Sequence, residues 1–183
     1  MKPCTTLLQL SAVFLASTFT AAGKVPDGIW VRDGYKLTVA VDSLKSPRFL
    51  AYGPDNTLYV SVPKEGKVYA CKDADGNGSY EAVSPFIEGR NPKMIPQGIQ
   101  WHNGALWLAQ LDAVTNHSDT DGDGKADKVI EVLGPDDIPT GKKSGHSWRA
   151  LLIHGDKIYT HVGDQSNATD EPIDASERKK IWT

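Results

Sequence analysis

A recurring hairpin pattern most constrains how this chain can fold. An apolar run, a turn rich in glycine, asparagine or aspartate, and a second alternating run occur together in residues 49–60, 98–108 and 150–162. Two short strands around such a turn are typical of a β-hairpin. The aromatic markers of the three copies are Tyr59, Trp107 and Tyr159. They are spaced 48 and 52 residues apart. Self-similarity at roughly 40–50 residues, with about four short strands per unit, indicates a β-propeller.

Other segments fit the same repeat. Residues 35–41 alternate between apolar and polar side chains and predict a strand, which Ser46 and Pro47 would end. Residues 66–71 predict another strand. Acidic loops at residues 73–81 and 119–127 lie 46 residues apart, at equivalent places in their units. The loops therefore support the repeat independently of the strands, and the chain is expected to be all-β.

The two acidic loops have the form D-x-[DN]-x-[DN]-G-x-x-[DE], which predicts calcium binding. Alternate side chains on a tightly turning backbone point inward, and Ca²⁺ prefers six to eight oxygen ligands. The pattern lacks the glutamate at the twelfth position that completes an EF-hand. A plain hairpin turn rich in aspartate and glycine is the alternative. We expect structural sites on the blade edges. The candidate ligands are Asp119, Asp121, Asp123, the Lys125 carbonyl and Asp127 in one loop, and Asp73, Asp75, Asn77 and Glu81 in the other.

The start of the chain resembles a secretory signal peptide. Lys2 precedes an uncharged, mostly apolar run from Leu7 to Ala22, which ends in small residues. A membrane anchor is the alternative, but the run is shorter than the ~20 residues that span a bilayer. We therefore predict a signal peptide at residues 1–22, one domain at residues 23–183, and a secreted or periplasmic location. No stable membrane span is expected after cleavage.

Charge and cysteine content narrow the range of partners. The formal net charge is −3, and removal of Lys2 with residues 1–22 would make it −4. Such a mild charge does not favour a nucleic-acid or membrane-surface partner. Of the two cysteines, Cys71 alone would remain after cleavage, so no intramolecular disulfide is expected.

Three stretches together resemble the glucose/sorbosone dehydrogenase family. They are residues 46–61 (SPRFLAYGPDNTLYVS), 119–128 (DTDGDGKADK) and 145–167 (GHSWRALLIHGDKIYTHVGDQSN). The last stretch is the most specific, and the resemblance covers essentially all of the chain after residue 22. It implies a secreted, six-bladed β-propeller that uses pyrroloquinoline quinone (PQQ) and Ca²⁺ to oxidise a sugar or an aldehyde.

The resemblance also implies roles for individual residues. His146 matches the general base that takes a proton from the substrate hydroxyl while hydride passes to the quinone. Arg149 matches a position that could pair with a carboxylate or stabilise developing negative charge. A metal ion in the cofactor site would polarise the quinone carbonyl. The residues that match cofactor-binding positions are Gln97, Asp164, Gln165 and Asn167.

The sequence departs from the family in two respects. Gly145 stands where soluble glucose dehydrogenases have an aspartate before the histidine, which favours the sorbosone-type branch. The chain is also long enough for only about two and a half to three of six blades. The family's basic residues that hold the cofactor's carboxylates come from later blades. We therefore expect an N-terminal fragment of a longer protein that is inactive alone, with unpaired strand edges.

Two other functions fit a propeller. One is a non-catalytic module that binds a protein or a glycan through one face, and it would be indifferent to His146→Ala. The other is a lactonase-type hydrolase, which would act without quinone and needs acidic or amide side chains at the pocket end of each blade. Asp164 and Asn167 are the candidates for that role. His102 and His154 fall in equivalent hairpin turns and are expected to be structural.

Overall fold

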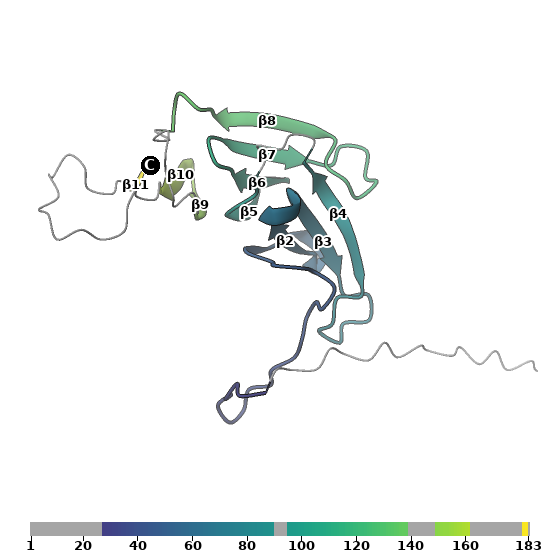
Figure 1. Cartoon of the computed structure of the whole chain (residues 1–183). Helices are drawn as coiled ribbons and strands as arrows, with labels where there is room; N and C mark the ends of the chain where they lie inside the picture. The colour runs from purple at the N-terminus through teal and green to yellow at the C-terminus, as the bar shows by residue number, and fades with distance from the viewer. Residues whose placement is uncertain (1–26, 90–94, 139–148, 162–180, 183) are drawn as a thin grey trace, which may run out of the picture.

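The described part of the chain consists of short strands. The computed structural model describes residues 27–89, 95–138, 149–161 and 181–182. Within these ranges the strands form three antiparallel sheets, and the only helical elements are two 3-10 turns (Figure 1). None of the described segments is a helix long and apolar enough to cross a membrane. The expectation of an all-β chain is confirmed, whereas the predicted signal peptide at residues 1–22 lies outside the described residues.

Strands that follow one another in sequence pair with one another in every sheet. The first sheet contains β1 (Leu50–Tyr52), β2 (Leu58–Val62), β3 (Lys67–Lys72) and β4 (Ala82–Glu88), with the turns η1 (Pro54–Asn56) and η2 (Pro63–Glu65) beside β2. The second sheet contains β5 (Ile99–His102), β6 (Ala105–Ala109), β7 (Val114–Ser118) and β8 (Lys128–Leu133). The third sheet contains β9 (Leu151–His154), β10 (Lys157–His161) and β11 (Ile181–Trp182). The predicted hairpins and the strand at residues 66–71 are thus confirmed.

The sheets are arranged side by side, as in a β-propeller. Strand β5 contacts both β1 and β9, so the first strands of the three sheets lie next to one another. Strands β4 and β8 lie on the outer side of their sheets (Figure 1). The acidic loops connect β3 to β4 and β7 to β8, which confirms their equivalent positions.

The main hydrophobic core lies between the first and second sheets. Leu106 and Leu108 of β6 are completely buried, and burial of such a side chain contributes about 1.5–3 kcal/mol. They pack with Ile99 of β5 against side chains of the first sheet. Those first-sheet side chains are Tyr59, Val68, Ala70, Phe86 and Ile87.

An aromatic cluster of Tyr59, Phe86 and Trp101 joins these two sheets. The rings of Tyr59 and Trp101 are stacked, with centroids 5.3 Å apart and planes 14° apart, and Phe86 meets Tyr59 edge-on at 4.9 Å. Gly53 makes room for this stack, because a Cβ there would lie 2.5 Å from Cε2 of Tyr59. Burial, with a smaller contribution from Asp119, raises the pKa of Tyr59 to about 12. The second acidic loop therefore lies close to the first sheet.

The opposite face of the first sheet is covered only in part. Leu58, Val60 and Cys71 are buried there, with Val41 and Leu44 packed against them. The strand predicted at residues 35–41 is absent, so that prediction is wrong. A strand needs a neighbour for its backbone groups, and residues 35–41 instead receive two hydrogen bonds from the first acidic loop. Tyr80 N donates to Ala40 O, and Ser79 Oγ donates to Val39 O.

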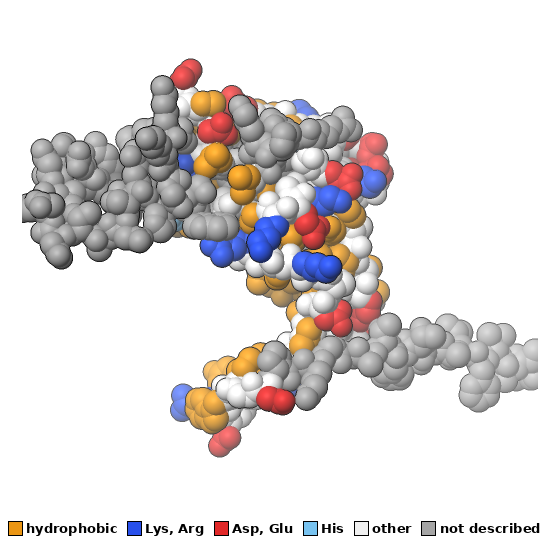
Figure 2. Space-filling view, in the orientation of Figure 1, with side chains coloured by type: hydrophobic (Ala, Val, Ile, Leu, Met, Phe, Trp, Pro, Cys, Tyr) orange, Lys and Arg blue, Asp and Glu red, His pale blue; other side chains and the backbone are white. Residues whose placement is uncertain are grey.

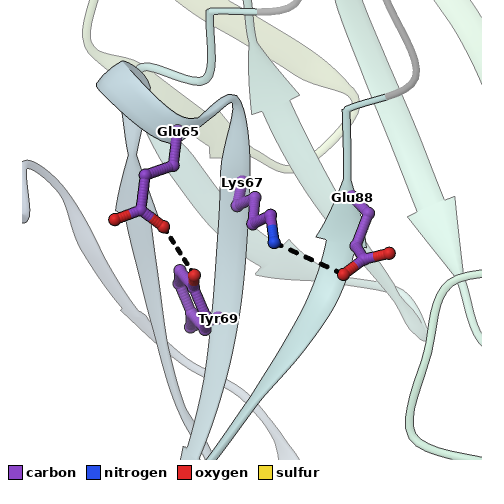
Figure 3. A network of polar contacts seen from close by, with 4 residues as sticks. All are labelled: Glu65, Lys67, Tyr69 and Glu88. Carbon is purple, nitrogen blue, oxygen red and sulfur yellow. Dashed lines mark hydrogen bonds and ion pairs between the residues drawn. The ribbon is translucent and has the colours of Figure 1, made fainter. Parts of the chain in front are cut away.

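A polar network ties the outer strands of the first sheet together (Figure 3). Tyr69 Oη donates to Glu65 at 2.6 Å, and this bond raises the pKa of Tyr69 to about 12. Lys67 on β3 and Glu88 on β4 form an ion pair of 3.5 Å, and they are partners in the strand register. Because both side chains of the ion pair reach solvent, it contributes little to stability. Its main effect is on the relative position of β3 and β4.

Candidate functional site

The candidate site lies where the chain enters two neighbouring inner strands. Gln97 lies two residues before the start of β5, and Arg149 lies two residues before β9. Gly98 N donates to the carbonyl of Arg149 at 2.8 Å, and Gln97 N donates to the carbonyl of Ala109 at 2.9 Å. The two residues that the sequence assigned to the cofactor and to catalysis are therefore brought to the same end of adjacent sheets.

Gly98 permits this close approach. A Cβ at position 98 would lie 2.6 Å from the backbone nitrogen of Leu151 and 2.8 Å from the carbonyl oxygen of Arg149. The Gln100 side chain fixes the same contact, because its amide donates to the carbonyl of Ile153 and accepts from the Ile153 N–H. These bonds, of 3.0 and 2.7 Å, hold β9 against β5 and so set the position of Arg149.

Gln97 and Arg149 are buried without partners for their side chains. Each is 1% exposed. Within the described ranges, neither the Gln97 amide atoms nor any of the three guanidinium nitrogens of Arg149 has a hydrogen-bond partner. Leaving such groups unpaired in the interior is costly, and the cost is greatest for a charge. An arrangement of this kind is expected where a ligand supplies the missing partners.

The electrostatics of the site favour an anion. Burial lowers the pKa of the Arg149 guanidinium, while the negative charge of Asp112 raises it. Arginine nevertheless stays protonated in proteins, so the site holds a buried positive charge. A planar guanidinium matches the two oxygens of a carboxylate. The Gln97 amide adds one acceptor and two donors.

Asp112, whose negative charge acts on Arg149, is a residue that sequence reasoning missed. It lies in the turn between β6 and β7, which Gln110 N closes by donating to the carbonyl of Ala113. This turn is at the same end of the second sheet as Gln97. No motif marks Asp112 in the sequence, and only the order of strands brings it near Arg149. The other predicted site residues lie outside the described residues: His146, Asp164, Gln165 and Asn167.

The first acidic loop brings its carboxylates together. Carboxylate oxygens of Asp73, Asp75 and Glu81 all lie within 4.8 Å of one another. Asp73 accepts the N–H groups of Gly76, Asn77 and Gly78, and these bonds, that of Gly78 above all, lower its pKa. The Asn77 amide donates to Asp75 and Glu81. All four predicted ligands therefore meet in one loop.

The second acidic loop differs at its end. Oxygens of Asp119, Asp121 and Asp123 lie within 4.8 Å of one another, and Asp119 accepts N–H groups from Gly122 and Gly124. Asp127 instead accepts two hydrogen bonds from Thr120, from its N–H and its hydroxyl. Lys125 N donates to Asp123. The structure therefore groups three of the four predicted carboxylates and leaves Asp127 at a neighbouring position.

Both acidic loops lie away from Gln97 and Arg149. Strand β7 begins beside the turn that holds Asp112 and ends at Ser118, where the second loop starts. Five residues of strand span roughly 16 Å, at about 3.3 Å per residue. A metal ion in the loop could not touch a ligand at Arg149. The predicted placement of the acidic loops away from the pocket agrees with this topology.

His117 is buried in the second sheet and is not available as a base. Its Nε2 shares a hydrogen bond of 2.9 Å with Thr115 Oγ1, which also accepts from Gln110 Nε2. Burial lowers the pKa of His117 to about 4. The ring is therefore neutral near pH 7 and has a structural role.

Comparison with known proteins supports the fold. The sequence matches no protein-family model and no curated protein. Among solved structures, the chain is similar to a Trichoderma reesei member of Carbohydrate-Active Enzymes Family AA12 in a calcium structure, with a TM-score of 0.52 and 16% identity over 66% of this chain and 30% of the other. It is similar to a luciferin-regenerating enzyme, with a TM-score of 0.51 and 16% identity over 74% of this chain and 43% of the other.

A third similar structure comes from Thermus thermophilus and is assigned as an oxidoreductase (glucose dehydrogenase). Its TM-score is 0.51, with 14% identity over 82% of this chain and 47% of the other. The chain thus spans less than half the length of each of these three structures. At such identities the likeness concerns the fold alone, and the chain shares the all-β, β-propeller-like fold of these structures.

Proposed function

We propose that this chain forms part of a PQQ-dependent dehydrogenase that oxidises a sugar or an aldehyde. The observation that carries the proposal is the pair of buried, unpartnered polar side chains at the same end of neighbouring inner strands, Gln97 and Arg149. The resemblance of residues 145–167 to glucose/sorbosone dehydrogenases and the likeness in fold to an assigned glucose dehydrogenase support it. The signal-like residues 1–22 favour action outside the cytoplasm.

The residues present fit the cofactor. PQQ carries three carboxylates and an ortho-quinone, so it needs cationic and hydrogen-bonding groups around it. Arg149 offers unpaired guanidinium donors, which suit a carboxylate, and the Gln97 amide offers unpaired donors and an acceptor. We propose that these two residues hold the cofactor with the help of Asp164, Gln165 and Asn167. When bound, the quinone supplies the acceptor for the hydride that leaves the substrate.

The chain's own residues would prepare the substrate for that transfer. We propose that neutral His146 accepts the proton of the substrate hydroxyl, since an imidazole with a pKa near neutrality suits this step. Its place three residues before Arg149 in the sequence would bring the base near the cofactor-binding cation. The buried setting of Arg149 strengthens its attraction for anionic oxygens, because little water competes for it.

Binding of PQQ tests the proposal directly. Titration of the purified chain with PQQ, in the presence of Ca²⁺, is expected to show saturable binding by change in the absorbance of the quinone. Because the chain spans less than half the length of the similar structures, binding without turnover is expected when an aldose and a reducible dye are added. Lack of quinone binding would overturn the proposal and favour the non-catalytic module, and lactone hydrolysis without quinone would favour the hydrolase.

We also propose that the acidic loops hold Ca²⁺ as structural sites. Addition of Ca²⁺ in excess of its dissociation constant is expected to raise the thermal midpoint, with a stabilisation of about 2.7 kcal/mol at a hundredfold excess. Asp119→Asn should remove much of this shift, because Asp119 is one of the three carboxylates of the second cluster. Asp136→Asn is the matched control, since Asp136 is exposed and belongs to neither cluster. Equal calcium shifts in both variants would contradict a site at the second loop.

A further inference from the structure

The first acidic loop contains an Asn-Gly dipeptide, Asn77-Gly78. Both residues lie in the connection between β3 and β4, and both are exposed. Acidic side chains are visible at the surface where this connection lies in Figure 1 (Figure 2). An asparagine side chain can be attacked by the backbone nitrogen of the next residue, and glycine hinders that attack least because it has no Cβ. The surroundings of the dipeptide in the loop decide whether such an attack is assisted.

The nitrogen that would attack lies against a carboxylate. Gly78 N donates to Asp73 Oδ2 at 2.8 Å. The other oxygen, Asp73 Oδ1, accepts the N–H groups of Gly76 and Asn77, so the carboxylate is held in place. A base within about 2.6–3.2 Å of the atom whose proton it removes is positioned for general base catalysis. Asp73 is therefore placed to take the proton of Gly78 N as that nitrogen attacks.

The side-chain amide of Asn77 is held at both of its ends. Asn77 Oδ1 accepts a hydrogen bond of 2.7 Å from the N–H of Ser79. A backbone donor at such a distance stabilises the negative charge that develops on this oxygen when the amide carbon is attacked. Asn77 Nδ2 donates to Asp75 Oδ2 at 2.9 Å and to Glu81 Oε1 at 3.5 Å. The loop therefore contacts the attacking nitrogen, the carbonyl oxygen and the nitrogen that would leave.

We propose that Asn77 is a site of spontaneous deamidation that the loop itself promotes. The Gly78 nitrogen forms a bond to Cγ of Asn77 and loses its proton to Asp73. The bond from Cγ to Nδ2 breaks, and Nδ2 takes up a proton from the solvent and leaves as ammonia. Water then opens the cyclic imide to aspartate or isoaspartate. One water is consumed and one ammonia is released, with no change in oxidation state. The proposal does not depend on the dehydrogenase function.

Deamidation changes the charge balance of the loop. The Asn77 amide donates to two of the three carboxylates that lie within 4.8 Å of one another, those of Asp75 and Glu81. An aspartate at position 77 replaces these donors by a negative oxygen, so attraction becomes repulsion. The first loop then carries the acidic residue that the second loop has 46 residues later, Asp123. The modified loop therefore depends more strongly on a bound cation for its conformation.

A second Asn-Gly dipeptide serves as an internal comparison. Asn103 and Gly104 are also exposed, and they form the two-residue turn between β5 and β6. Both adopt positive φ, 48° and 77°, and the paired strands on either side maintain this turn. Closure of the imide ring changes the backbone torsions of the asparagine, which this turn resists. Asn77 instead lies between two glycines, Gly76 and Gly78, whose backbone can adjust. We therefore expect Asn103 to react more slowly than Asn77.

Ageing of the purified full chain in a buffer with a chelator tests the proposal. Asn77 is the one asparagine of the tryptic peptide 73–90, so the mass of this peptide follows the exchange of NH2 for OH at that residue. In the folded chain, Asn77 is expected to convert about tenfold or more faster than Asn103, because the loop positions the reacting groups. In urea the two rates should converge. Equal rates in the folded chain would overturn the proposal.

A substitution tests the role of the carboxylate. Asp73→Asn should slow the conversion of Asn77 about tenfold or more, as loss of a general base does. Asp136→Asn is the matched control, because Asp136 is exposed and belongs to neither acidic loop. An unchanged rate in Asp73→Asn would show that the loop does not promote the reaction. The comparison of Asn77 with Asn103 uses the unsubstituted chain, so it stays decisive if Asp73→Asn fails to fold.

Discussion

Arg149→Met is expected to weaken PQQ binding by about 100- to 1,000-fold, while the cofactor-free protein becomes more stable. Loss of a buried charge that pairs with a bound anion costs roughly 3–4 kcal/mol of binding free energy. In the free protein the same charge is buried without a hydrogen-bond partner among the described residues. Replacement by an apolar side chain of similar length removes the free-energy cost of burying this charge. Such replacements stabilise proteins by about 1–4 kcal/mol.

Quinone titration and thermal unfolding measure the two effects separately. Arg32→Met is the matched control, because Arg32 is exposed and should change neither quantity. Arg149→Lys retains the charge but loses the planar fork, and it should bind PQQ with intermediate affinity. If Arg149→Met lowers both stability and binding, the arginine has a structural role and the proposed cofactor contact fails.

Gly98→Ala is expected to destabilise the protein by about 3 kcal/mol, at the upper end of the usual range for added bulk. The new Cβ would lie within 3 Å of three backbone atoms of residues 149–151, and backbone cannot yield as a side chain does. Strand β9 would have to move away from β5, and Arg149 would move with it. Quinone binding should therefore fall together with the free energy of unfolding, which denaturant titration measures.

Gly134→Ala is the matched control for this substitution. A Cβ at Gly134 would meet mainly the end of the Glu131 side chain, 2.8 Å away, and that side chain can rotate aside. A cost below about 1 kcal/mol is expected there. Comparable losses in the two variants would show that contact between β5 and β9 is unimportant for stability.

Local sequence patterns predicted the strands well because each hairpin carries its own signals. Asn103 and Gly104 both adopt positive φ, 48° and 77°, as a two-residue turn between paired strands requires. The repeat spacing also predicted equivalent positions for the acidic loops. The strand predicted at residues 35–41 failed for a different reason, since alternation supplies a suitable face but not the neighbouring strand on which pairing depends.

The candidate site was predictable only in part. Gln97 and Arg149 were selected through a family resemblance, yet their burial and lack of partners depend on the contact between Gly98 and β9. Asp112 carries no local signal and is near Arg149 only because the β6–β7 turn lies at that end of the sheet. Asp127 fits the calcium pattern in sequence, but a nearby threonine offers its carboxylate two hydrogen bonds. Residue spacing alone does not show whether the Asp127 carboxylate binds a calcium ion or accepts these hydrogen bonds.

The bond from Ala126 to Phe86 has a consequence for how unfolding spreads through the molecule. The second acidic loop connects strands of the second sheet but donates a hydrogen bond to β4 of the first, so the second sheet is held to the first. Coupling of this kind acts between nearest neighbours, and the free energy of the array is then close to a sum of sheet and interface contributions. Opening is therefore expected to begin at an end sheet and to advance one interface at a time, with the contact between the first and second sheets as the last to separate.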